Sequence, residues 1–143
     1  MERKDWLLLT LAEAGADGLS PVQLQKSVFL ICEMVKQTRK EECYVFEPHN
    51  YGPFSANVYA DAEALEEQGL ADIDAAGPRR YARYRATSEG QDKAPALRSN
   101  LDEPVRIYLT QVVRWVKEKT FPELIRAIYQ WFPPYKVNSV FRG

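Results

Sequence analysis

The sequence has few of the residues from which metal and redox sites are built. Its 143 residues include one histidine, His49, and two cysteines, Cys32 and Cys43, which form no CxxC motif. Structural zinc usually needs four Cys or His ligands, so we expect no metal site and no cofactor. The two separated cysteines favour a reducing compartment, and one disulfide between them stays open as an alternative.

Long apolar runs are also missing. The first apolar stretch, residues 6–9, is followed by Thr10 and Glu13, and it is too short for a signal segment or a membrane span. We therefore expect a cytoplasmic protein without a membrane partner. Hydrophobic residues make up 45% of the chain, which is a globular composition and excludes bulk disorder.

Charge of one sign is not in excess overall, but it is unevenly distributed. The 19 Lys and Arg against 20 Asp and Glu give a net charge of -1, which excludes a uniformly basic surface. Residues 51–76 carry no basic side chain, whereas residues 77–100 carry four arginines close together. This pattern indicates either an electrostatic dipole or two solvated faces of opposite sign.

Apolar residues at helical spacing predict five helices, and Ser20 and Pro21 mark the start of the second one. The predicted helices cover residues 5–14, 21–35, 54–68, 105–116 and 121–132.

Strand and loop predictions fill the intervals. Residues 44–46 are β-prone, and residues 70–73 and 79–87 predict a hairpin around a Gly-Pro turn. Residues 91–104 are polar with two prolines, which predicts an irregular connection, and the apolar tail 137–141 is expected to dock on the core.

The order of these elements predicts a mainly α (α+β) fold with a winged-helix-like core. Three helices followed by a hairpin is the winged-helix order, in which the hairpin is the wing and residues 54–68 take the position of the recognition helix. We predict a winged-helix-like domain over residues 1–90 and a C-terminal helical extension over 91–143, packed together as one compact domain.

The predicted wing carries the strongest local signal for nucleic-acid binding. Arginines interleaved with tyrosines fit phosphate groups, and a wing can rest on the DNA backbone; a solvated edge strand protected by charge is the alternative. Ser55 and Asn57, in the first turn of the predicted recognition helix, are the candidates for base contacts. The candidate phosphate ligands are Arg79, Arg80, Arg83 and Arg85.

The predicted recognition helix argues against DNA, because it contains acids and no Lys or Arg. This acidic helix is the candidate docking surface for a partner protein in the alternative hypothesis. Its candidate residues are Asp61, Glu63, Glu66 and Glu67.

Three segments, "LQKSVFLICE", "YVFEPHNYGPFSANVYADAEALEEQGLAD" and "RYRATSEG", resemble the YwgA-like bacterial proteins and, more distantly, the Panacea-domain (SocA-like) antitoxins. The shared features are a Leu-Gln-Lys run (residues 24–26) and a Tyr-Gly-Pro turn (51–53); the tail "YQWFPPYKVNSVFRG" is similar to the YwgA-like group. The resemblance implies a winged-helix-like core and a role in toxin neutralisation or defence-associated regulation. It brings no catalytic residues with it.

Because both motifs recur together in the resemblance, we expect Lys26 to contact the turn at Tyr51. His49 has only Glu47 nearby as a partner for catalysis, so a structural role in the turn is the preferred interpretation. The aromatic residues concentrate in the C-terminal third, which favours a homodimer.

The first functional hypothesis is a non-enzymatic, DNA-binding transcriptional regulator. The alternative is a protein-interaction module, either an antitoxin or an adaptor, that does not bind DNA.

Overall fold

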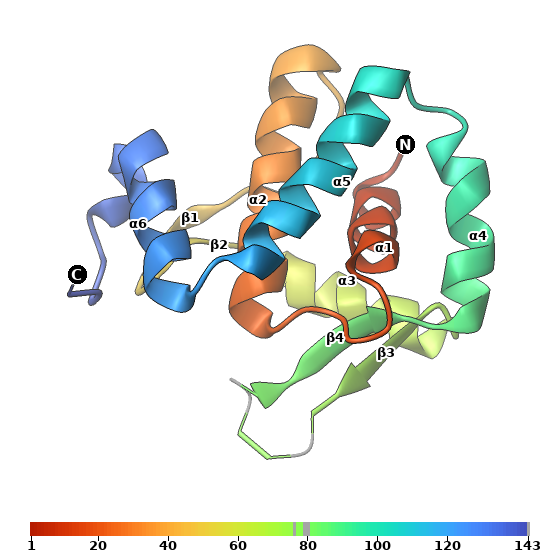
Figure 1. The fold of residues 1–143 in the computed structure, drawn as a ribbon, viewed down its shortest axis with the longest axis horizontal. Coiled ribbons are helices and arrows are strands. Elements are labelled where there is room, and N and C mark those ends of the chain that lie inside the picture. The colour runs from red at the N-terminus through yellow and green to blue at the C-terminus, as the bar shows by residue number, and fades with distance from the viewer. Residues whose placement is uncertain (76, 79–80, 143) are drawn as a thin grey trace.

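The fold of the computed structural model is mainly helical, as predicted, with small antiparallel strand pairs (Figure 1). The structure describes residues 1–75, 77–78 and 81–142. In chain order the elements are α1 (Arg3–Ala14), α2 (Pro21–Thr38), β1 (Glu47–His49), β2 (Gly52–Phe54), α3 (Ala56–Glu67), β3 (Ala71–Asp74), β4 (Arg83–Ala86), α4 (Ser88–Arg98), α5 (Glu103–Glu118), α6 (Phe121–Trp131) and the 3-10 helix η2 (Pro133–Lys136).

Helix starts lie where local chemistry satisfies the free N–H groups of the first turn. Ser20 accepts a hydrogen bond from the backbone N–H of Gln23, whose side chain accepts from the N–H of Ser20 in return. Pro21 occupies the first position of α2, where a missing N–H costs nothing. The predicted start of this helix is confirmed.

Helix α1 lies at the centre of the molecule, with α2, α4 and α5 around it (Figure 1). Its side chains are buried on nearly every side: Trp6, Leu7, Leu9 and Leu11 are all 0% exposed. Leu7 and Leu11 pack with the hairpin side of the core, whereas Trp6 and Leu9 pack with α5 and α6. One helix therefore joins both halves of the core.

The predicted hairpin is confirmed, and it is tied to the loop between α1 and α2. Strands β3 and β4 pair antiparallel, with Ile73 opposite Tyr84. Leu19 and Tyr84 exchange backbone hydrogen bonds of 2.8 and 2.9 Å, so the loop forms an isolated bridge with β4. The pair projects from one end of the helical body (Figure 1).

Two segment predictions are wrong. Residues 44–46 are not a strand; the pairing lies further on, where β1 and β2 flank the predicted turn and bring His49 opposite Gly52. Residues 88–98 form α4, which takes up most of the segment 91–104 predicted to be an irregular connection. Thr87 caps this helix by accepting from the N–H of Gly90, and Pro95 lies within it while buried Ala94 packs on the core. Tertiary contact outweighs the poor helix propensity of this segment.

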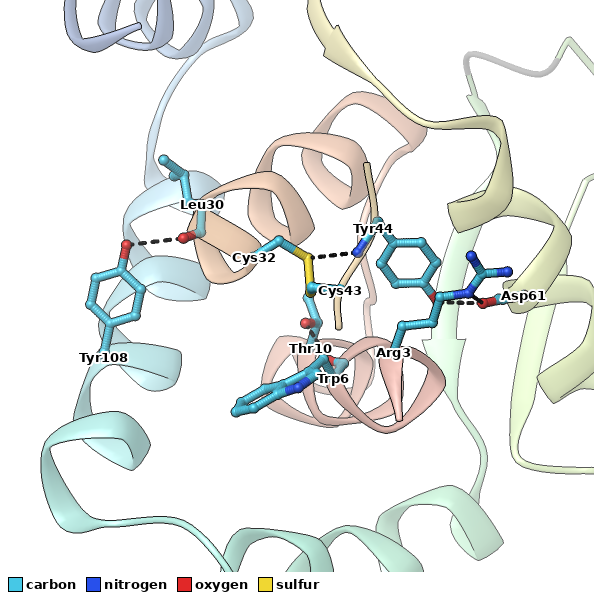
Figure 2. The surroundings of a disulfide bond; sticks show 9 residues. All are labelled: Arg3, Trp6, Thr10, Leu30, Cys32, Cys43, Tyr44, Asp61 and Tyr108. Atoms are coloured by element: carbon cyan, nitrogen blue, oxygen red, sulfur yellow. Dashed lines mark hydrogen bonds and ion pairs between the residues drawn. A yellow bond between two sulfur atoms is a disulfide. The ribbon is translucent and has the colours of Figure 1, made fainter. Parts of the chain in front are cut away.

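The two cysteines are joined by a disulfide, the alternative that the sequence left open, and Cys32 is also part of the hydrophobic core (Figure 2). The bond ties the middle of α2 to the segment that precedes β1. The backbone N–H of Tyr44 faces the sulfur of Cys32 at 3.4 Å, and the phenol of Tyr44 donates to Asp61 on α3. A disulfide persists in oxidising surroundings, so the cysteine count no longer supports a reducing compartment.

None of the described helices is both long and apolar enough to cross a membrane.

The bridge between Leu19 and Tyr84 predicts a severe effect of Gly18→Ala. Gly18 has φ +65°, and a Cβ there would lie 2.3 Å from the carbonyl oxygen of Tyr84. Gly77→Ala is a matched control, because Gly77 also has positive φ (+88°) but its Cβ would meet nothing within 4 Å. In urea unfolding we expect Gly77→Ala to cost about 1 kcal/mol and Gly18→Ala at least about 2 kcal/mol more. Equal losses would contradict the close approach.

Candidate functional site

The Leu-Gln-Lys and Tyr-Gly-Pro motifs are in direct contact, as predicted. The side-chain amide of Gln25 donates to the carbonyl of Ser55 at 2.9 Å and accepts from the N–H of Ser55 at 3.0 Å. Gln25 is 2% exposed and Ser55 is 4% exposed, so these hydrogen bonds lie out of water. They fix the end of β2 and the start of α3 against the N-terminal part of α2. We call these two hydrogen bonds, together with the hydrogen bond from Lys26 to Pro53 described next, the Gln25–Lys26 clamp.

Lys26 completes the clamp from the next position of α2. Its ammonium donates to the carbonyl of Pro53 at 3.1 Å, and its side chain is buried. Among the described residues no carboxylate lies within 4.0 Å of this nitrogen. Burial without a counter-charge lowers the pKa of Lys26 to about 7.

Gly52 lies in the turn that the clamp holds, and its φ of +101° favours glycine at this position. A Cβ there would be in ordinary contact with its neighbours, 3.7 Å from Cε of Lys26 and 3.4 Å from the ring of Tyr129 on α6. The tail supports the turn from the other side, where the N–H of Val140 donates to the carbonyl of Asn50 at 2.9 Å. The tail therefore docks on this turn, while Val140 itself stays 53% exposed.

A pocket of about 230 Å³ opens beside the clamp, which we call the Lys26 pocket. His49 lies at its edge and stacks on Phe54 with ring centroids 4.7 Å apart. Helix α2, the β1–β2 turn and α3 supply its walls. The lining residues are Val22, Gln25, Lys26, His49, Asn50, Tyr51, Gly52, Phe54 and Tyr59.

The described arginines of the predicted wing have partners within the protein. Arg83 donates to the carbonyls of Asp17 and Gly18, both at 3.0 Å. Arg85 lies 4.0 Å from the carboxylate of Asp72 on the neighbouring strand. Arg79 and Arg80 lie outside the described residues. The structure thus gives Arg83 a role in holding the α1–α2 loop on β4.

The candidate base-contacting residues, Ser55 and Asn57, do not lie together at the surface. Ser55 is buried under Gln25, whereas Asn57 is exposed on the first turn of α3. Ser55 is the N-cap of α3, but its side chain makes no capping hydrogen bond.

The acidic candidates for partner docking on α3 also differ: two make contacts within the protein, and the other two are exposed. Asp61 accepts from both Arg3 and Tyr44 and is a structural carboxylate (Figure 2). Glu66 accepts from the N–H of Ile73 at 3.0 Å, which ties α3 to β3. Glu63 and Glu67 are exposed.

A second surface feature is an apolar groove of about 350 Å³ between α2, α5 and α6, which we call the α5 groove. Trp115 and Trp131 line it with ring centroids 5.1 Å apart, and Trp131 is 54% exposed. Tyr108 anchors the groove by donating to the carbonyl of Leu30 at 3.2 Å (Figure 2). The concentration of aromatic residues in the C-terminal third was the sequence signal for this site, but spacing alone could not bring α5 and α6 together.

An arginine-rich hollow of about 470 Å³ adjoins the α5 groove and shares Gln111 with it. Arg98, Arg106 and Arg114 line this hollow together with one acid, Glu103. Arg98 pairs with Glu13, whereas Arg114 is exposed and has no ion pair with any described residue. Apolar and basic surface therefore lie side by side along α5.

Within the described part of the chain, no group of three or more His, Cys, Asp or Glu side chains is arranged to hold a metal ion. Comparison of the chain with protein-family models, curated proteins and solved structures finds no match.

The buried ammonium predicts a specific pH dependence of stability. Above about pH 7 the folded protein releases the Lys26 proton, whereas the unfolded chain keeps it up to the ordinary lysine pKa of 10.5. The unfolded state then holds more protons, so the free energy of unfolding rises with pH by about 1.4 kcal/mol per unit across this window.

We expect the difference in unfolding free energy between the wild type and Lys26→Met to grow in favour of the wild type from pH 7 to 10. Lys36→Met, at an exposed position of the same helix, is the control and is expected to give a flat difference. Urea unfolding at each pH measures both differences. Parallel curves for the wild type and Lys26→Met would show that the lysine is not buried as a charge.

Proposed function

We propose that this protein is a non-enzymatic protein-interaction module that binds a partner segment along α5. The observation that carries the proposal is the continuity of the aromatic α5 groove with the arginine-rich hollow. Tryptophan and arginine are the side chains that most often dominate binding energy at protein interfaces. Toxin neutralisation, which the sequence resemblance implies, also requires a partner protein.

Charge complementarity defines the partner. Residues 101–143 carry seven Lys or Arg and four Asp or Glu, so this part of the chain is net positive, and three arginines with one acid line the hollow itself. The partner segment is expected to place apolar side chains in the groove, next to Trp131, and acidic side chains in the hollow, next to Arg114. An amphipathic helix with an acidic flank meets both requirements.

Selection of displayed peptides on the purified protein tests this proposal. We expect the enriched sequences to combine two or three apolar anchors with flanking Asp or Glu. Trp131→Ala and Arg114→Glu are each expected to weaken a selected peptide by about tenfold or more. The matched controls are Val137→Ala, at a residue 75% exposed outside the groove, and Lys93→Glu on α4, and both are expected to leave binding unchanged.

Failure to enrich any such peptide, or equal binding by Trp131→Ala and the wild type, would reject the proposal. Light scattering on the same samples separates a homodimer from a heterologous partner. If a second copy occupies the groove, the wild type will be a dimer and Trp131→Ala a monomer, which would replace the acidic segment as the occupant.

Duplex DNA is the second candidate partner, and one observation favours it. The order α1, α2, α3 and then the β3–β4 hairpin, with Leu19 bridged to β4, is the order expected of a winged helix. Against it, the outer face of α3 carries exposed Glu63 and Glu67, which would meet phosphate charge in a major groove.

Fluorescence anisotropy with a random-sequence duplex over a salt series tests the DNA hypothesis. A DNA-binding protein will show affinity that falls steeply with salt, and the double variant Arg79→Ala/Arg80→Ala will flatten that slope. Lys93→Ala is the control for a simple loss of positive charge. Absence of binding at low salt, or a slope that the arginines do not affect, would remove DNA from consideration.

A further inference from the structure

The Lys26 pocket contains a charge that the fold leaves uncompensated. Lys26 is 3% exposed, and its ammonium, which has three donors, makes one hydrogen bond within the described part of the chain, to the neutral carbonyl of Pro53. Its ion-pair partner is missing among the described residues, although lysines are seldom fully buried unless paired. A hydrophobic side chain would fill the same position at a lower cost in desolvation.

The walls of the pocket suggest what would supply the missing charge. Tyr51, Phe54 and Tyr59 provide flat apolar surface, and Asn50 and His49 provide polar atoms at the rim. Tyr51 is 42% exposed, so the pocket is open to solvent on its side. A small ligand could therefore enter, place an anionic group near Lys26 and pack its apolar body on the aromatic rings.

We propose that the Lys26 pocket binds an organic carboxylate, with the carboxylate group facing Lys26 and an aromatic or aliphatic body against Tyr51, Phe54 and Tyr59. One carboxylate balances one ammonium and accepts its charge-assisted hydrogen bonds. A phosphate dianion would bring more charge than this single cation balances. The proposal does not depend on the α5 groove, with which the pocket shares no lining residue.

Titration with benzoate tests the proposal, with benzamide as the neutral probe of the same shape. The readout is the NMR signal of the Lys26 ε-carbon in protein labelled with 13C-lysine, which reports on this site alone. We expect benzoate, but not benzamide, to shift the signal in a saturable way. Because a carboxylate binds the charged amine, benzoate is also expected to raise the pKa of Lys26 above its free value of about 7.

The affinity for benzoate should then be constant below the free Lys26 pKa of about 7 and should fall as the pH rises above that value. The other titratable side chains that line the pocket are His49, Tyr51 and Tyr59. His49→Gln removes the imidazole, so retention of the same pH profile in this variant assigns the proton to Lys26.

Substitutions in the pocket give a second test of benzoate binding. Lys26→Met is expected to weaken benzoate binding by about tenfold or more, measured by calorimetry. Tyr51→Ala leaves the clamp intact and removes one apolar wall, so it should weaken benzoate while preserving the fold. Equal shifts from benzoate and benzamide, or unchanged benzoate binding in both variants, would overturn the proposal.

Two further probes distinguish the possible sources of the carboxylate, a protein C-terminus and a free small acid. A short peptide with an aromatic C-terminal residue and a free carboxylate will compete with benzoate if the natural ligand is a protein terminus, and its amidated form will not. If only benzoate and other small carboxylates bind, the ligand is a free metabolite-sized acid. Binding of inorganic phosphate in preference to every carboxylate would contradict the assignment.

Discussion

The Gln25–Lys26 clamp is the interaction on which the arrangement of the surface depends. Two consecutive side chains of α2 reach the backbone of residues 53 and 55, about thirty positions further along the chain. An unpaired buried amide or carbonyl costs about 1–3 kcal/mol, so the buried backbone of this turn needs these partners. The clamp fixes the β1–β2 pair, the start of α3 and one wall of the Lys26 pocket at the same time. The disulfide and the contact of Tyr44 with Asp61 hold the preceding segment at its other end.

The two halves of the clamp differ in their physical consequences. Gln25 is neutral, and each polar atom of its amide is matched by a group on Ser55, so it contributes order without a charge. Lys26 introduces a charge that its surroundings do not balance, and the lowered pKa is the result. A glutamine or a methionine at position 26 would fit a purely structural role better. The cost of the lysine is the reason to look for a ligand at this pocket.

Sequence reasoning performed well where local chemistry decides the structure. The Ser20–Pro21 start, the β3–β4 hairpin and the contact between the two motifs follow from capping, turn composition and motif pairing. It failed where tertiary contact overrides propensity, as in α4, whose Pro95 suggested a connection. It left the Cys32–Cys43 disulfide undecided and could not bring Trp115 to Trp131, because such neighbours are set by how helices pack and not by spacing in the chain. The wing arginines illustrate the same limit, since their sequence gives no sign that Arg83 is held by the carbonyl of Gly18.

Hydrogen exchange at the backbone amide of Ser55 tests the central claim most directly. Because this N–H donates to Gln25 in a buried setting, we predict slow exchange in the wild type, similar to that of core helix amides. Gln25→Ala should speed exchange at Ser55 by roughly a hundredfold or more, while Ser55→Ala, which keeps the backbone contacts, should leave it slow. Fast exchange at Ser55 in the wild type, or equal protection in Gln25→Ala, would show that the clamp does not organise this surface.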